Sequence, residues 1–145
     1  MSVSLYFLCN LVLFQNQMKE NQHEILKRGT EITERYFEFL NQHIDDVVSG
    51  RVIAFMEINE IASALFLSHT HLTDTIQKET GNHPCYFYDL KIIERAKELL
   101  SSSATPIAEV ARVLTYDPSN FSKFFKKFVG KTPGQYRKNL KNIEV

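Results

Sequence analysis

The sequence predicts an all-α protein, and three observations lead to this fold class. Apolar residues recur at three-to-four spacing along most of the chain, as they do on the buried face of a helix. Proline and glycine stand at the ends of these segments, where helices begin and stop. The only short β-branched run is VIAF at 52–55. A length of 145 residues with 43% hydrophobic and 23% charged residues is typical of one globular domain.

The amino-terminal residues 1–29 are expected to form an apolar segment and a linker. The stretch SVSLYFLCNLVLF is interrupted by Asn10 and is too short to span a membrane, and no Lys or Arg precedes it as in a secretory signal. We expect a helix that packs on this domain or on an absent neighbour. This pattern suggests that the chain is the tail of a longer protein.

The domain proper is expected to cover residues 30–145 and to begin with an amphipathic helix. Thr30 is placed as its amino-terminal cap, acidic residues follow in the first turn, and the helix ends near Gly50. A short helix at 57–65 and a longer one at 68–80 come next, and the longer one stops at Gly81.

Three further helices begin at prolines. A linker helix at 84–101 starts with Pro84, and Thr105-Pro106 and Asp117-Pro118 each place a cap before a first helical proline. The last of these starts predicts a helix from Pro118 to Val129.

An internal repeat organises the chain. A shift of 49 residues lays residues 60–87 over residues 109–136 without a gap, so that Ala62 meets Ala111 and Gly81 meets Gly130. Each copy is a short helix, a tight turn and a longer helix closed by glycine, which is the layout of a helix-turn-helix. The small alanine in each copy suits two helices that cross closely. A duplicated helical hairpin without a ligand is the alternative.

Charge favours the helix-turn-helix interpretation. Residues 1–90 carry 6 Lys and Arg against 12 Asp and Glu, whereas residues 91–145 carry 11 against 5. In the helix from Pro118 to Val129 four phenylalanines form one stripe, and serine, asparagine and lysine occupy the opposite face. Short polar side chains near a helix start can approach base edges, lysines can meet phosphates or guanine, and the helix amino terminus favours phosphate. A solvated basic face is the alternative.

The run PIAEVARVLTYDPSNFSKFFKKFVGKTPGQYRKNL resembles the signature of the AraC/XylS family of bacterial transcription regulators, with the G-x-TP-x-x-YR ending at 130–137. The resemblance covers about residues 52–140. It implies a seven-helix domain with two helix-turn-helix units, at about 57–81 and 106–130, which read two successive major-groove segments of double-stranded DNA. The linker helix at 84–101 would span about 27 Å, compatible with recognition helices roughly one DNA turn apart.

Four positions depart from the family pattern. Thr115 and Phe66 stand where the turn commonly has glycine, so a left-handed backbone there would cost about 1 kcal/mol. Lys123 replaces a frequent base-reading arginine, and Asp74 takes that place in the first unit, where an acid repels phosphate. We therefore expect the first unit to contribute less affinity than the second.

The candidate DNA-binding residues fall into two groups. In and after the second recognition helix they are Ser119, Asn120, Ser122, Lys123, Lys126, Lys127, Lys131 and Lys138, and in the first they are Thr70, His71, Thr73, Asp74 and Gln77.

The expected protein is a cytoplasmic, nucleoid-associated transcription regulator, not an enzyme, with no cofactor and no membrane contact. Histidines 69, 71 and 83 and Cys85 match no zinc spacing, so no metal is expected. The expected partners are double-stranded DNA, RNA polymerase and a second copy bound through the amino-terminal segment or an upstream sensor and dimerisation domain. The alternative function is a protein-interaction module that uses the apolar amino-terminal segment, with an inherited, weakly DNA-binding scaffold.

Overall fold

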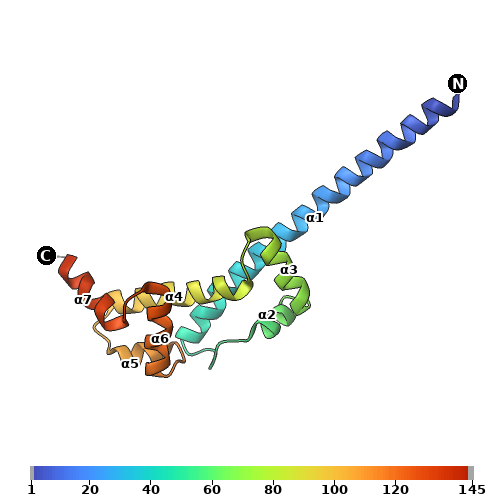
Figure 1. Ribbon diagram of the computed structural model, residues 1–145. Helices are drawn as coiled ribbons and strands as arrows, with labels where there is room; N and C mark the ends of the chain where they lie inside the picture. Colours follow the sequence, from blue (N-terminus) through green and yellow to red (C-terminus); the bar gives the residue numbers. More distant parts are fainter. Residues whose placement is uncertain (1, 144–145) are drawn as a thin grey trace.

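The computed structural model describes residues 2–143, with side chains from residue 4 on. These residues form seven helices and no strand, which confirms the all-α class (Figure 1). The helices are α1 (Ser2–Val48), α2 (Ile58–Ala64), α3 (His69–Thr80), α4 (Pro84–Ser102), α5 (Ile107–Val113), α6 (Pro118–Val129) and α7 (Pro133–Ile143). Met1, at the start of the expected amino-terminal segment, and residues 144–145, at the end of the expected domain, lie outside the described residues.

Helix α1 is one continuous helix of 47 residues, about 70 Å long, and its first part extends away from the other helices (Figure 1). The prediction that a helix begins at Thr30 is therefore wrong. The Thr30 hydroxyl instead donates to the backbone carbonyl of Leu26 one turn earlier, at 3.1 Å. The interior Gly29 is buried against the side chain of Glu79 on α3, so tertiary packing holds the helix together at its weakest residue.

Two apolar clusters share the central helix α4. The first joins α1, α2 and α3 to the amino-terminal half of α4 through residues such as Tyr88 and Ile92. The second joins α5 and α6 to its carboxyl-terminal half through residues such as Ile93 and Leu100. Helix α4 therefore fixes the two helix-turn-helix units relative to each other, as the linker interpretation predicts.

The two units have matching backbones. Helices α2 and α5 each have 7 residues, and α3 and α6 each have 12. Ala62 and Ala111 are both fully buried, which confirms the expected close helix contact. Both longer helices end in a left-handed glycine, at Gly81 and Gly130. The repeat seen in the sequence is thus a repeat of structure.

Hydrogen bonds between distant segments brace this arrangement. The Tyr36 hydroxyl donates to the Pro84 carbonyl at 2.8 Å and joins α1 to α4. The Arg137 guanidinium donates to the carbonyls of Leu100 at 3.1 Å and Thr105 at 2.6 Å, so α7 holds the end of α4.

In the described part of the chain, no helix has both the length and the apolar content that crossing a bilayer requires.

Candidate nucleic-acid interface

Helix α6 begins and ends where the sequence predicts. Asp117 caps it, Pro118 is its first residue, and Gly130 closes it with a φ of 80°. The Asp117 carboxylate accepts hydrogen bonds from the backbone N–H groups of Ser119 at 3.1 Å and Asn120 at 3.4 Å. This cap fixes the first turn of α6, which carries the residues expected to approach bases.

The apolar face of α6 anchors the helix. Phe121 and Phe125 are completely buried, while Phe124 and Phe128 are half-buried at the edge of the core. Phe124 stacks on Tyr116, with ring centroids 5.2 Å apart. The predicted stripe of four phenylalanines therefore consists of two core residues and two at its border.

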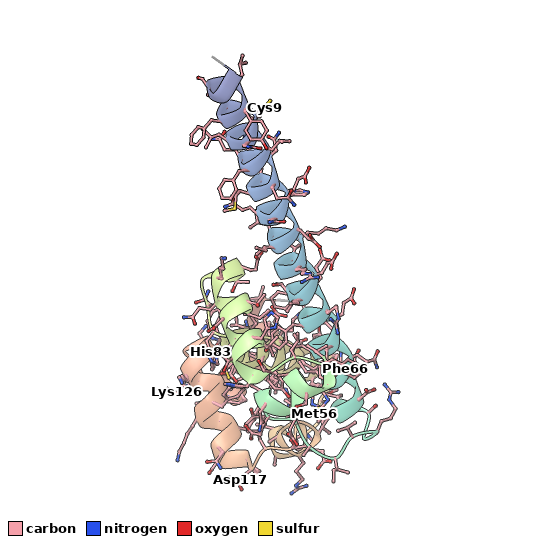
Figure 2. The ribbon with its side chains drawn as sticks, turned by 90° about the vertical axis from the view of Figure 1, so that its right-hand side faces the viewer. Cys9, Met56, Phe66, His83, Asp117 and Lys126 are labelled. Atoms are coloured by element: carbon pink, nitrogen blue, oxygen red, sulfur yellow. The ribbon has the colours of Figure 1, made fainter. Side chains whose placement is uncertain are left out.

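The opposite face of α6 is open to solvent. Figure 2 shows Lys126 and the cap Asp117 on this helix at the outer edge of the molecule. The exposed residues are Ser119, Asn120, Lys123, Lys126 and Lys127, with Ser122 half-buried beside them. The ion pairs found among the described residues involve none of these lysines. The face therefore keeps its positive charge free for an anionic partner.

The amino terminus of α6, in contrast, is closed to phosphate. The Asp117 carboxylate occupies the free N–H groups of the first turn and also accepts a hydrogen bond from the Ser119 hydroxyl at 3.0 Å. The hydrogen bonds from Ser119, followed by that from the Asn120 backbone, lower the pKa of this carboxyl, so it is negatively charged at neutral pH. The expectation that this helix terminus favours phosphate is therefore wrong, because the cap supplies the anion.

Two lysines extend the positive surface beyond α6. Lys131, in the turn after the helix, and Lys138, on α7, are both exposed. One acid that the sequence reasoning missed lies nearby. Asp89 on α4 is half-buried, and burial raises its pKa while the charge of Lys127 acts in the opposite direction. Its position in the middle of the linker helix gave no sequence signal.

Helix α3 divides the candidate residues of the first unit between two surfaces. Thr70, Asp74 and Gln77 are exposed and share one face at i, i+4 and i+7. His71 lines a crevice between α3 and α1, on another side of the helix. The hydroxyl of Thr73 is buried, and no described residue bonds it, so it is not open to a base edge.

The two recognition helices lie on one side of the molecule, with the packed end of α1 on the other (Figure 2). A series of aromatic contacts links α4 to α6. The Phe55 ring lies 5.9 Å from that of Tyr88 and 6.4 Å from that of Tyr116, and Tyr116 in turn stacks on α6. Among the described residues, no cluster of three or more potential ligands could hold a metal ion.

The turn of each unit has a left-handed backbone at the position where the family commonly has glycine. Phe66 has a φ of 61° and Thr115 a φ of 60°. The backbone N–H of Thr115 donates to the Arg112 carbonyl at 2.8 Å. Both turns therefore keep the geometry of a glycine turn with a side chain that strains it.

A family model described as a helix-turn-helix domain matches residues 61–139. The MmsAB operon regulatory protein of Pseudomonas aeruginosa is 36% identical over 93 residues, which are 63% of this chain and 30% of the relative. The Msm operon regulatory protein of Streptococcus mutans is 30% identical over 106 residues, 72% of this chain and 37% of the relative. The chain thus spans about a third of the length of these curated relatives.

The fold has a counterpart among solved structures. The C-terminal domain of AraT, a response regulator from Geobacillus stearothermophilus, superposes with a TM-score of 0.65 and 29% sequence identity. The match covers 74% of this chain and 84% of that domain. The two-unit arrangement is therefore shared with a known protein domain.

Proposed function

The chain belongs to the AraC/XylS family of helix-turn-helix proteins, and from this premise we propose that it is a sequence-specific DNA-binding transcription regulator. Its two units would enter two successive major-groove segments on one side of the duplex. Two of the relatives are operon regulatory proteins, which supports a role in transcription.

The observation that carries this proposal is the solvent face of α6. It presents exposed lysines that take part in none of the ion pairs among the described residues, on a helix anchored by buried phenylalanines. Lys123, Lys126, Lys127, Lys131 and Lys138 would contact phosphates, and Ser119, Asn120, Ser122 and Lys123 would read bases. The Ser119 hydroxyl already donates to Asp117, so this serine would act as an acceptor.

The first unit would bind more weakly. Its recognition helix exposes Thr70 and Gln77 for hydrogen bonding, but Asp74 lies between them on the same face. A carboxylate there repels phosphates and suits only the amino group of cytosine. Thr73 would contribute little, because its hydroxyl is buried. His71 is exposed, but it borders the crevice between α3 and α1 and lies off the face that carries Thr70 and Gln77.

The remaining parts of the proposal follow from this role. RNA polymerase would be a protein partner of a regulator of this kind, and a second copy is a further candidate. A protein that regulates bacterial genes acts on the nucleoid, so the proposed location is the cytoplasm. The proposed division into an amino-terminal segment, 1–29, and a DNA-binding domain, 30–145, places the boundary inside α1, close to where that helix begins to pack.

The test is a binding titration with duplex DNA selected from a random pool, repeated at several salt concentrations. Lys126→Ala should weaken binding to all duplexes and lower the salt slope by about one unit, because one phosphate contact is lost. Lys19→Ala, an exposed lysine on the first part of α1, is the matched control and should change neither. An unchanged slope in Lys126→Ala would remove this residue from the interface.

Base reading needs a separate measurement. Lys123→Ala should reduce discrimination at one or two base pairs by about 1 to 3 kcal/mol. The measurement is a repeat of the random-pool selection with this variant, and an identical selected sequence would exclude Lys123 from the reading set.

A protein-interaction module is the second candidate, and the exposed apolar side chains of α1 together with Asp74 favour it. The same titration separates the two functions. In that titration, an interaction module would show no binding to duplex DNA even at low salt.

A further inference from the structure

A small cavity lies between the two helix-turn-helix units, against α4. Its volume is about 200 Å³, and its walls come from the segment that leads into α2, from α4 and from the turn before α6. The lining includes the side chains of Phe55, Met56, Cys85, Tyr88, Asp89 and Tyr116. Since a cavity of roughly 150 Å³ can hold a molecule of the size of benzene, this one suits a ligand of about six to ten heavy atoms.

Three aromatic rings line this cavity. The centroid of the Phe55 ring lies 5.9 Å from that of Tyr88 and 6.4 Å from that of Tyr116. Two of the rings are also held by other contacts, because the Tyr88 hydroxyl donates to the Met56 carbonyl at 3.2 Å and Tyr116 stacks on Phe124. The fold therefore positions the rings without an occupant. The faces of such rings attract cations that come within about 6 Å of the centroid.

The Asp89 carboxylate supplies a negative charge in the same lining. It takes part in none of the ion pairs among the described residues, and burial raises its pKa with no hydrogen bond to oppose this effect. The charge of Lys127 acts on Asp89, but the Nζ atom of Lys127 lies over the Phe128 ring, 5.7 Å from its centroid. A half-buried carboxylate of this kind is stabilised by a cation that reaches it.

Other groups of the lining experience the same negative charge. Burial, and after it the charge of Asp89, raises the pKa of the Cys85 thiol and of the Tyr116 hydroxyl. Glu57 adds a second carboxylate at the exposed rim of the cavity. These charges repel anions and attract cations. Three rings with two carboxylates offer few donor atoms to a metal ion, and they suit an organic cation better.

We propose that this cavity binds a small organic cation, a methylated ammonium, with its charge over the aromatic rings and beside the Asp89 carboxylate. The arrangement is an aromatic cage, the kind of site that recognises quaternary ammonium groups. A primary ammonium would fit less well, because aromatic rings leave most of its N–H donors without an acceptor. The occupant would contact the segment that leads into α2, the linker helix α4 and the turn before α6 at once. This site goes beyond the proposed DNA binding and does not depend on it.

The first test is a titration of the isotope-labelled chain with choline, followed by NMR. The amide signals of residues 55–58 and 85–92 and of Tyr116 should shift and saturate, with a dissociation constant of about 1 mM or below. The matched probe is dimethylbutanol, in which carbon replaces the charged nitrogen of choline, and it should bind roughly tenfold more weakly. Equal affinities for the two probes, or no saturable shift at about 100 mM choline, would overturn the proposal.

The second test removes the charge from the protein. Asp89→Asn keeps the size of the side chain and should reduce choline affinity roughly tenfold, while the affinity for dimethylbutanol stays the same. Glu94→Gln is the matched control, because it removes an exposed acid from the same helix in a different crevice, and it should change neither affinity. If both variants lose choline affinity equally, the attraction comes from the net charge of the chain and the proposed site is wrong.

The third test concerns the rings. Tyr116→Leu removes one ring and should weaken choline binding about fivefold, whereas Tyr116→Phe keeps the ring and should bind choline as the parent chain does. Because Tyr116 also stacks on Phe124, thermal unfolding of each variant is followed by circular dichroism. A folded leucine variant with the parent affinity would refute the aromatic cage, and if that variant does not fold, the result for Asp89→Asn decides.

Discussion

Replacement of Thr115 by glycine should stabilise the protein, because Thr115 adopts a left-handed backbone with a φ of 60°. A side chain in this conformation costs roughly 1 to 2 kcal/mol relative to glycine. Glycine loses more backbone entropy on folding, which offsets roughly 0.5 to 1 kcal/mol of this gain. Thr115 is exposed and its N–H bond to Arg112 survives the change, so little packing is lost. The expected net gain is about 0.5 to 1 kcal/mol.

Urea unfolding followed by the helical circular dichroism signal measures this gain, and the melting temperature should rise by about 2 to 4 °C. Thr115→Ala is the control that keeps a Cβ atom, and it should bring no gain. In the opposite direction, Gly130→Ala should cost a similar amount, since no atom within 4 Å would meet the new Cβ and only its φ of 80° opposes the change. If glycine and alanine at position 115 prove equally stable, the strain argument is refuted.

Three other changes probe the cap, the core and the end of α4. Asp117→Asn keeps an oxygen acceptor but removes the negative charge at the start of α6. It should therefore tighten duplex binding severalfold in a titration at low salt, and weaker binding would contradict this reasoning. His43 is buried and accepts a hydrogen bond from the Met56 N–H at 3.0 Å, and burial lowers its pKa below the ordinary 6.5. Stability from neutral His43 is therefore present above about pH 6.5 and lost as the pH falls below it, and urea unfolding of His43→Gln should show a weaker decline between pH 7 and 5. Arg137→Ala removes two hydrogen bonds and should cost about 1.5 to 3 kcal/mol in urea unfolding, while Lys138→Ala stays within about 0.5 kcal/mol; equal effects would contradict the bracing role.

Helix ends were predictable where a cap, a proline or a glycine marks them. Asp117 caps α6 as expected, and α3 and α6 end at the expected glycines. The expected Thr105 cap is wrong, because α5 begins at Ile107 and Pro106 occupies the cap position. The start of α1 was not predictable in this way, because Thr30 looks like a cap but lies inside a helix. A threonine can bond to the carbonyl one turn back as well as cap a terminus, and only the packing of Gly29 against α3 decides between the two.

The candidate interface was predictable on α6 and less so on α3. On α6 the phenylalanine stripe fixes the buried side, so the exposed residues follow from the helical period alone. On α3 a second neighbour, α1, covers an additional side of the helix. The sequence contains no local sign of that contact, and for this reason His71, which is exposed but borders the crevice toward α1, was grouped with residues of the other face.

A comparison of the two units distinguishes the residues that determine the backbone from the exposed residues that determine binding. They agree in helix length, in the buried alanine, in the left-handed turn and in the closing glycine. They differ in surface charge, since Asp74 stands where the second unit has Lys123. Because core and turn residues set the geometry and exposed residues set the partner, the first unit can have less attraction for a polyanion than the second without any change in backbone shape. Under the proposed function, the first unit would bind more weakly and would still help to set the position of the second unit along the duplex, because α4 joins the two units.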